Sequence, residues 1–288
     1  MTRRWCIPLT TMALVIGSWL AAGVASAAPV APHAVAPHAV AAHAVAAHAT
    51  AHPAGWIPSD PPMIRPTGVT QPNARGRQFQ EESTNWSGYA VTGSNGAFSS
   101  VSSSWTEPTA TCSSSRRSSD QYAAFWVGLD GYSSDSVEQT GTDSDCDGRT
   151  PDYYGWYEMY PADPVYFSNT VEPGDHISAS VTFSGTETYK LVLTDSTQGW
   201  TQTITKNESG LDRSSAEVIT EAPSSDTGVL PLADFGTVNY SASDANGTSF
   251  ASHSPTSIIM VDSSGNQEDS TSSISSSGAF SNTWLRSS

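Results

Sequence analysis

Residues 176–183 read HISASVTF, a stretch in which polar and apolar side chains alternate without a break. In an extended strand alternate residues point to opposite faces, so the apolar side chains from Ile177 to Phe183 share one face. A strand with one apolar and one polar face is typical of an antiparallel sheet that covers a core on one side. This stretch therefore predicts an all-β fold built from half-buried strands.

Stretches on both sides of it have the same character. Residues 153–160, 191–193 and 257–261 are rich in β-branched, apolar or aromatic side chains, and turn signals separate them, such as EPGD at 172–175 and SNG at 94–96. No segment keeps a helical period for long enough to indicate a helix. About a dozen short strands in roughly 205 residues predict an antiparallel two-sheet β-sandwich.

The N-terminal residues 1–27 have the features of a secretory signal peptide. Arg3 and Arg4 provide positive charge, an apolar stretch runs from about residue 7 to residue 24, and residues 25–27 (ASA) offer a cleavage site between small side chains. No later stretch is long and apolar enough to span a bilayer. We therefore expect the mature protein to be secreted and not bound to a membrane.

The next residues, 28–80, are predicted to be a propeptide or linker in front of one domain at 81–288. Between residues 31 and 53 a five-residue unit (APHAV and variants of it) repeats and contains five of the chain's 7 His. Such a tract has nothing from which to build a core. It is a plain spacer, a tether that becomes cationic below about pH 6, or a metal-binding tract, and the sequence leaves all three open.

The chain is strongly acidic. Its 288 residues include 28 Asp and Glu but only 12 Lys and Arg, which gives a formal net charge of −16. Binding to nucleic acid or to an anionic membrane needs clustered basic residues, so this charge argues against both partners. From Gln78 onward seven basic residues accompany 27 acidic ones. A domain this acidic repels itself until its carboxylates are protonated, which favours function at low pH.

Two cysteines, Cys112 and Cys146, remain once the signal peptide is removed. Two cysteines in an exported chain most often pair, so we expect a disulfide; two free thiols are the alternative. On the chain-entropy model, a bridge that closes this loop of ~34 residues stabilises the fold by roughly 3–4 kcal/mol.

Motifs of several other enzyme classes are incomplete. Residues 143–148 (DSDCDG) resemble the start of a calcium loop, but Tyr154 stands where the twelfth residue should be Glu, so we interpret them as a turn. Residues 226–228 (DTG) resemble the aspartic peptidase triplet, but a dyad needs two copies. His176 and His253 are the only histidines of the domain, too few for a His-ligated metal or a ready Ser/His triad. We therefore predict no metal and no other cofactor.

Carboxyl and amide groups among aromatic residues are the remaining candidates for chemistry. Residues 215–221 read SAEVITE, and in a strand Glu217, Ile219 and Glu221 share a face. Two carboxyl groups on one face of a short apolar strand are unusual unless they are paired or functional.

Six short segments carry a resemblance to a known family. They are, in chain order, residues 84–88 (TNWSG), 125–131 (FWVGLDG), 138–141 (EQTG), 156–161 (WYEMYP), 216–221 (AEVITE) and 233–236 (ADFG). In this order and at this spacing they resemble the glutamic peptidases (eqolisins), acid endopeptidases best known from fungi. The resemblance covers roughly residues 83–260, and the set is specific although each segment is weak alone.

The resemblance implies a fold and a site. The family fold is a concanavalin-like jelly roll with two seven-stranded antiparallel sheets, and the catalytic Gln and Glu of the family correspond to Gln139 and Glu221. The substrate cleft of the family corresponds to Trp86, Trp126, Asp130, Trp156 and Glu158. We therefore expect Gln139 and Glu221 to meet on one face of a sheet.

Such a pair suits peptide hydrolysis. A carboxylate at Glu221 can take a proton from a water molecule, which then attacks the peptide carbonyl. The amide of Gln139 can donate a hydrogen bond to the oxyanion, and hydrogen bonds to Glu221 would keep it partly ionised in acid. The resemblance thus predicts a pepstatin-insensitive acid endopeptidase, acting as a monomer on proteins or peptides, without a metal or a covalent intermediate.

The chain departs from the family pattern at several positions. Tyr154 stands where a compared member of the family has an acidic residue, Met159 replaces a more usual aromatic, and Thr220 and Ala222 flank Glu221 in place of an apolar residue and an acid. These differences affect the electrostatics of the cleft and the pKa of Glu221. Glycosylation sequons are present at Asn85, Asn207, Asn239 and Asn246.

Other interpretations fit the same residues. The three tryptophans can be ordinary core residues, Glu158 a structural carboxyl group and Asp130 a turn residue. Aromatic residues with paired carboxyl groups (Glu138, Glu158 and Glu221) also suit a β-sandwich glycoside hydrolase or a carbohydrate-binding lectin. The acidic surface, rich in Ser and Thr, suits a non-catalytic surface module.

Overall fold

A computed structural model describes residues 58–66, 80–113 and 119–287. The predicted signal peptide at 1–27 and most of the predicted propeptide or linker at 28–80 lie outside these ranges. Within the three ranges the only helical element is one 3-10 turn, η1 (Phe250–His253), and no helix is long and apolar enough to cross a membrane. The prediction of an all-β fold is confirmed.

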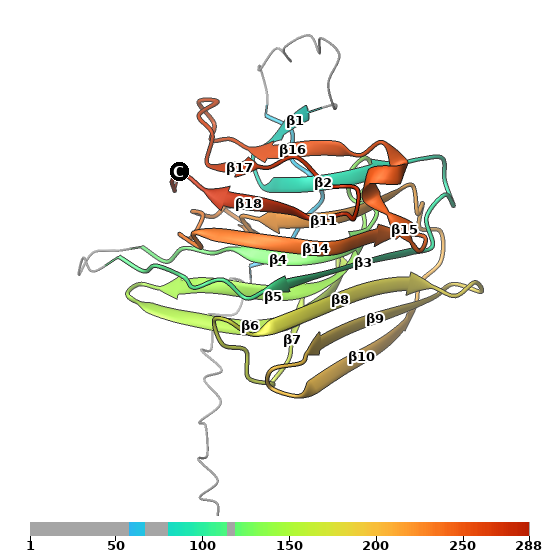
Figure 1. Cartoon of the computed structure of the whole chain (residues 1–288), viewed down its shortest axis with the longest axis horizontal. Helices are drawn as coiled ribbons and strands as arrows, with labels where there is room; N and C mark the ends of the chain where they lie inside the picture. The colour runs from blue at the N-terminus through green and yellow to red at the C-terminus, as the bar shows by residue number, and fades with distance from the viewer. Residues whose placement is uncertain (1–57, 67–79, 114–118, 288) are drawn as a thin grey trace, which may run out of the picture. The chain divides into compact units, whose positions relative to one another are not determined.

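The first of two large sheets has the strand order β1-β16-β2-β11-β4-β5-β6-β7 (Figure 1). Its strands are β1 (Gln80–Ser83), β16 (Thr256–Met260), β2 (Trp86–Thr92), β11 (Ser215–Glu221), β4 (Ala124–Leu129), β5 (Val137–Asp147), β6 (Thr150–Tyr160) and β7 (Val165–Tyr166). All neighbours are antiparallel except β1 and β16, which are parallel.

The second sheet has the order β10-β9-β8-β3-β14-β18-β17, with β15 paired to β14. Its strands are β10 (Trp200–Asn207), β9 (Thr188–Asp195), β8 (His176–Phe183), β3 (Ser100–Thr106), β14 (Thr237–Ala245), β18 (Phe280–Trp284), β17 (Asp269–Thr271) and β15 (Thr248–Ser249). A separate hairpin is formed by β12 (Ser224–Ser225) and β13 (Gly228–Val229). Each sheet has eight strands where the resemblance implies seven, and the shortest members, β7 and β15, have two residues each.

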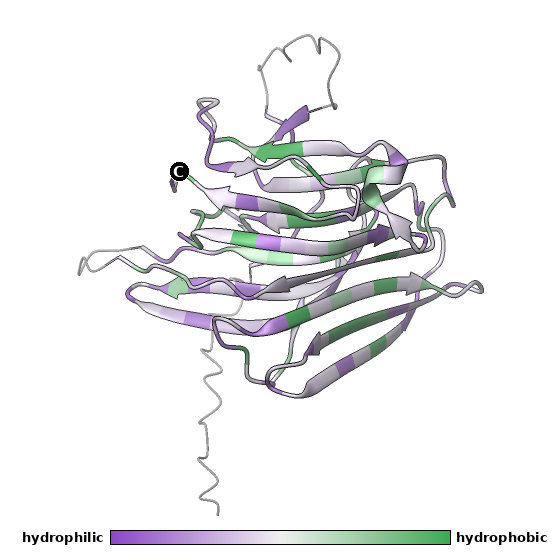
Figure 2. Ribbon diagram, viewed as in Figure 1, coloured by the Kyte–Doolittle hydropathy of each residue, from purple (hydrophilic) through white to green (hydrophobic). Residues whose placement is uncertain are grey.

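The core lies between the two sheets. Along β8 the side chains of Ile177, Ala179 and Val181 are buried there, and Figure 2 shows the alternation as green and pale bands. Opposite them the first sheet contributes alternate residues of its central strands, such as Phe125, Val127, Leu129 and Val218. The alternation of residues 176–183 therefore arises, as the sequence predicts, because one face of the strand packs against the core.

The first sheet is buried on its other face as well, the face that points away from the second sheet. A separate apolar cluster lies there, made of Met63, Trp86, Ala90, Ala124, Trp126, Tyr132, Val137, Trp156, Ile219 and Ile258. As a result every residue of β4 and β11 is buried. Strands covered on both sides do not alternate between polar and apolar residues, which explains the continuous run in β4.

The local predictions concern turns and the disulfide, and one of them is wrong. Gly96 and Gly174 adopt positive φ angles of 80° and 94° inside the predicted turns. The predicted disulfide is present between Cys112 and Cys146, whose Cα atoms are 5.5 Å apart. The predicted turn over residues 143–148 is wrong for most of its length, because β5 continues to Asp147 and the turn begins only at Gly148.

Candidate active site

Gln139 and Glu221 lie on the same face of the first sheet. In β11 the side chain of Val218 enters the core between the sheets, whereas Ile219 belongs to the outer cluster, so Glu221 also points outward. In β5 the outward side chain of Val137 places Gln139 on that face too. Only β4 separates their strands.

The glycine of the Gln-Thr-Gly segment allows this packing. A Cβ atom at Gly141 would lie 2.1 Å from the carbonyl oxygen of Phe125 and 2.6 Å from the Cβ atom of Trp126. Both distances are far below van der Waals contact, so only glycine lets β5 lie this close to Phe125 and Trp126 of β4. The segment therefore positions Trp126 as well as Gln139.

The carboxyl group of Glu221 is buried and held by two nitrogen donors. Asn85 Nδ2 donates to Glu221 Oε1 at 2.8 Å, and Trp126 Nε1 donates to Oε2 at 3.0 Å. Burial raises the pKa of Glu221 well above its usual value, the charge of Asp60 raises it further, and the Asn85 and Trp126 hydrogen bonds lower it. Two donors aimed at one carboxyl group are suited to stabilise its ionised form once water can reach it.

The amide of Gln139 is oriented by Glu158. The two residues are directly opposite in β5 and β6, and Gln139 Nε2 donates to Glu158 Oε2 at 2.8 Å. The same nitrogen donates to the backbone oxygen of Asp60 at 2.6 Å, while Gln139 Oε1 is buried without a partner. Burial raises the pKa of Glu158 to about 8. One N–H of the amide is thus fixed on a side chain, and the other is directed at a peptide carbonyl.

The three predicted cleft tryptophans surround this pair. Trp86, Trp126 and Trp156 are all fully buried in the outer cluster. Trp86 and Trp126 contact edge to face with ring centroids 5.0 Å apart, and Trp156 Nε1 donates to Asp143 Oδ1 at 2.5 Å. They line the outer face of the sheet and not the core between the sheets.

Asp130 directly follows β4 and does not contact Gln139 or Glu221 through its carboxyl hydrogen bonds. It adopts a positive φ angle of 69° just after β4, and its carboxyl oxygens accept hydrogen bonds from the backbone nitrogens of Arg213 at 2.6 Å and Ser214 at 2.8 Å. These contacts fasten the chain just before β11 begins. Its geometry corresponds to the turn residue that the sequence left as an alternative.

Acidic residues continue along the same face beyond Glu158. Asp143 and Asp145 are buried in β5, and Tyr154 donates to Asp145 Oδ2 at 2.5 Å. Tyr154 is therefore a donor that satisfies a neighbouring carboxyl group. Burial, followed by the charge of Asp60, raises the pKa of Asp143 well above its usual value. Within the described ranges no group of three or more side chains has the composition of a metal site.

The other two glutamates considered from the sequence, Glu217 and Glu138, form none of the hydrogen bonds described above. Glu217 is buried on the outer face of β11, and neither of its carboxyl oxygens has a hydrogen-bond partner. Glu138 is adjacent to Gln139 in β5 and therefore points to the opposite face, toward the core. A sugar-cleaving pair of Glu138 with Glu158 or Glu221 would need both carboxyl groups on one face, so this arrangement does not provide it.

A segment from the predicted propeptide or linker covers the pair. We call residues 58–66 the leader segment. Its Asp60 carbonyl accepts the Gln139 hydrogen bond, and Trp86 Nε1 donates to the carbonyl oxygen of Pro61 at 3.1 Å. Asp60 itself is buried, with Oδ1 unpartnered. The leader segment therefore lies directly over Gln139, Trp86 and their neighbours.

Two residues of the site were not identified as such from the sequence. Asn85 stands beside Trp86 in a quoted segment but was interpreted only as a glycosylation sequon, and its complete burial against Glu221 rules out a glycan there in this fold. Asp60 lies 79 residues before its partner Gln139, so no local pattern could pair them. The Asn-Trp dipeptide was the one available signal.

Residues 84–284 match the model of the Peptidase A4 family. The chain is similar to aspergillopepsin-2 from Aspergillus niger, with 29% identity over 238 residues, which covers 75% of this chain and 83% of that protein.

Solved structures give the same picture. Scytalido-glutamic peptidase in complex with a peptide-based transition-state analogue is similar with a TM-score of 0.59 and 26% identity, over 70% of this chain and 98% of that chain. SCP-B, a member of the eqolisin family in complex with the tripeptide Ala-Ile-His, is similar with a TM-score of 0.55 and 25% identity, over the same shares.

Proposed function

Since the chain belongs to the Peptidase A4 family, the glutamic peptidases, and is therefore a peptide hydrolase, we propose that Gln139 and Glu221 are its catalytic pair. The proposed enzyme is a secreted endopeptidase that works in acid, is insensitive to pepstatin and acts as a monomer on protein or peptide substrates. The SCP-B complex with a tripeptide supports a peptide as the ligand.

One observation carries the proposal. Gln139 Nε2 lies 2.6 Å from the backbone oxygen of Asp60, a peptide carbonyl seated on the same sheet face as Glu221. An oxyanion donor must approach a peptide carbonyl in this way. Asn85, the partner of Glu221, reaches the neighbouring carbonyl oxygen of Pro61 at 3.4 Å, so both members of the pair are linked to one short stretch of backbone.

The proposed reaction begins with Glu221 as the general base. Its carboxylate takes a proton from a water molecule, and the oxygen of that water attacks the peptide carbonyl carbon. The Gln139 amide donates to the oxygen as negative charge develops on it, and such a donor typically contributes about 10²–10³ in rate. Glu221 then returns the proton to the leaving amine, which completes hydrolysis without a covalent intermediate.

Glu158 is proposed to position the amide. A primary amide has two N–H groups, and Glu158 accepts one of them at 2.8 Å. This contact fixes the rotation of the Gln139 side chain, so the second N–H stays directed at the substrate carbonyl. Preorganised donors stabilise the transition state without the cost of reorienting them during the reaction.

The electrostatics support work in acid. Burial and the neighbouring carboxyl groups raise the pKa of Glu221, and the hydrogen bonds from Asn85 and Trp126 oppose this. Removing the leader segment would admit water and take away the Asp60 carboxyl group, and burial and Asp60 are the two largest causes of the raised pKa. Glu221 can then ionise at a lower pH, as a base that works in acid requires.

The test is proteolysis by the processed protein. Wild-type protein should digest denatured casein in acid whether or not pepstatin is present, and both Glu221→Gln and Gln139→Ala should lose this activity. Glu217→Gln is the matched control and should retain most of it, because the Glu217 carboxyl group forms no hydrogen bond with either residue of the pair. Variants are processed with immobilised wild-type protein, so that lost self-processing is not mistaken for lost catalysis. Full activity in Glu221→Gln would disprove the proposal.

A further inference from the structure

We infer that the leader segment is a pseudosubstrate: residues 58–66 occupy the cleft in the register of a substrate, and Pro61 and Pro62 prevent its cleavage there. The inference rests on the proposed function, because the register is defined by Gln139 and Glu221. It adds to that function the means by which the intact chain is kept inactive.

The upstream end of the leader segment pairs with the domain through one β-bridge. Ser59 and Ser224 form an antiparallel bridge, with both N–H···O contacts at 2.9 Å. Just before it, the hydroxyl of Tyr166 donates to the carbonyl oxygen of Pro58 at 3.1 Å. Backbone pairing of this kind binds an extended peptide irrespective of its side chains. It is the contact expected on one side of a scissile bond.

The centre of the leader segment lies against the catalytic pair. The N–H of Asp60 donates to Glu158 Oε2 at 3.2 Å, and its carbonyl oxygen accepts from Gln139 at 2.6 Å. The next carbonyl oxygen, of Pro61, accepts from Trp86 Nε1 at 3.1 Å. Both peptide bonds in reach of the pair, 60–61 and 61–62, are thereby held by side chains of the site.

Both of these bonds end in a proline nitrogen. Cleavage requires that the leaving nitrogen be protonated as the tetrahedral intermediate breaks down. In Pro61 and Pro62 this nitrogen is enclosed in a ring that fixes φ and leaves no N–H. The ring restricts both the approach of Glu221 to the nitrogen and the rotation that the intermediate needs. A segment bound in this way resists the enzyme that holds it.

The downstream end is anchored by further backbone contacts. The N–H of Met63 donates to the carbonyl oxygen of Gly131 at 3.1 Å, and the Met63 side chain is buried in the outer cluster with the tryptophans. The N–H of Ile64 donates to Asn85 Oδ1 at 2.8 Å, so the residue that holds Glu221 also holds the leader segment.

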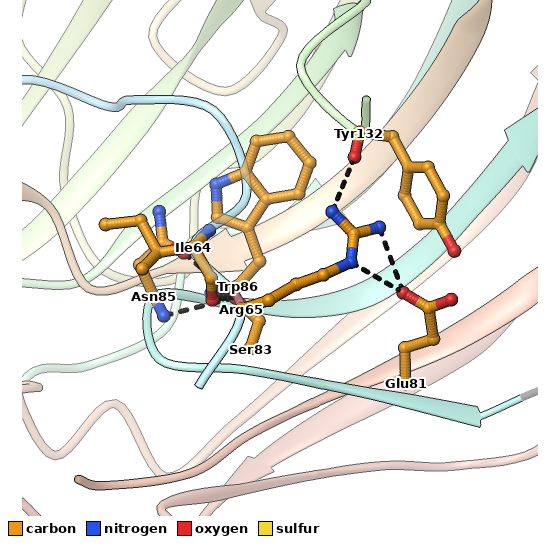
Figure 3. A network of polar contacts seen from close by, with 7 residues as sticks. All are labelled: Ile64, Arg65, Glu81, Ser83, Asn85, Trp86 and Tyr132. Atoms are coloured by element: carbon orange, nitrogen blue, oxygen red, sulfur yellow. Dashed lines mark hydrogen bonds and ion pairs between the residues drawn. The ribbon is translucent and has the colours of Figure 1, made fainter. Parts of the chain in front are cut away.

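Arg65 completes this anchor at the surface. Figure 3 shows its side chain reaching the carboxyl group of Glu81 at 3.0 Å and the carbonyl oxygen of Tyr132 at 3.0 Å. The guanidinium group also lies 4.8 Å from the centre of the Tyr132 ring. Contacts therefore run along the leader segment from Pro58 to Arg65, a length typical of a peptide in a protease cleft.

The electrostatics indicate that acid alone does not release the leader segment. The Asp60 carboxyl group interacts electrostatically with five neighbouring groups: Glu158, Asp143, Asp145, Glu221 and Tyr166. Burial, followed by the charges of Glu158 and Asp145, raises the pKa of Asp60 well above its usual value. The seated form therefore keeps its proton, is held most tightly in acid and loosens as pH rises. Activation in acid then requires that the chain be cut.

The test uses the full chain with Pro61 and Pro62 both replaced by alanine. In acid this variant should be cut after residue 60 or residue 61, which intact mass and N-terminal sequencing detect, while the wild type should not be cut at either bond. The same double variant carrying Glu221→Gln should stay uncut, which shows that the cleavage is by the chain's own site.

A second measurement uses a synthetic peptide of residues 58–66, PSDPPMIRP. Added to acid-activated protein, it should inhibit casein digestion competitively and be recovered intact, whereas its double-alanine form should be consumed. A peptide of reversed sequence is the control and should do neither.

Two results would overturn the inference. In the first, the double variant stays uncut and the peptide also fails to inhibit. In the second, the wild-type sequence is cut at 60–61 or 61–62. Failure of the proposed function is distinguishable from either, since casein digestion would then survive Glu221→Gln in processed protein.

Discussion

Replacing Asn85 by alanine tests how the proposed base is kept ionised in acid. Asn85 is fully buried, and its Nδ2 atom donates to Glu221 Oε1 at 2.8 Å. A hydrogen bond to a charged group contributes about 1.5–3 kcal/mol, and about 1.4 kcal/mol corresponds to one pKa unit. Losing it should raise the pKa of Glu221 in the processed protein by about one to two units.

The consequence for activity has a definite sign. The base must be ionised, so the acidic limb of the kcat/KM profile of Asn85→Ala should move to higher pH by the same one to two units, roughly. Below this limb the variant should lose about 10- to 100-fold in kcat/KM. Well above it, where Glu221 is ionised in both proteins, the variant should approach the wild type.

The assay is kcat/KM on a fluorogenic peptide over the acid range, with thermal unfolding to show that the fold is retained. Trp126→Phe is the matched variant, because it removes the other donor, 3.0 Å from Glu221 Oε2, and keeps an aromatic ring. It should displace the limb in the same direction. An equal loss at every pH, with the limb unmoved in both variants, would refute the reasoning.

Three further outcomes are expected. Glu158→Ala should lower kcat by about 10- to 100-fold because it leaves a buried N–H of the catalytic amide without its partner, and Glu158→Gln, which can still accept that bond, should restore most of it; equal losses would refute a positioning role. Replacing Cys112 and Cys146 with serine should lower the free energy of unfolding by about 3–4 kcal/mol in denaturant titrations, and no change would contradict the chain-entropy argument. Burial raises the pKa of Glu107 to about 8 and that of Glu138 to about 9, so their contribution to stability is complete below the unfolded value near 4.5 and is lost as pH rises through the folded values. Melting temperatures should therefore fall from acid toward alkaline pH, and a maximum at neutral pH would contradict this.

The alternation at residues 176–183 was sufficient to predict the fold class, because β8 is covered on one face only. The same alternation rule was less informative for β4 and β11. The outer cluster covers their second face, so these strands have no solvent-exposed face with polar residues. The misread turn at 143–148 has a related cause. Asp143 and Asp145 look like loop residues in the sequence, but they lie in β5 and their carboxyl groups accept hydrogen bonds from Trp156 and Tyr154 of the neighbouring β6.

The site was predictable to the extent that its parts lie in quoted segments. The alternation of β11 places Glu221 beside Ile219 on one face, but it cannot show which sheet face carries Gln139, because that depends on how β5 pairs with β4. The leader segment could not be predicted at all. Its contacts with Gln139 and Glu158 join residues 79 and 98 positions apart, and Pro61 and Pro62 indicate only an irregular stretch without the cleft beneath them.

The most direct test of the account is kcat/KM on a peptide substrate in acid for Gln139→Ala and Glu221→Gln, both processed by immobilised wild-type protein. Loss of the amide donor should cost about 10²–10³, and loss of the base should reduce cleavage to background, while thermal unfolding remains cooperative in both. Near-wild-type turnover by either folded variant would contradict the claim that this amide and this carboxyl group act together on one peptide bond.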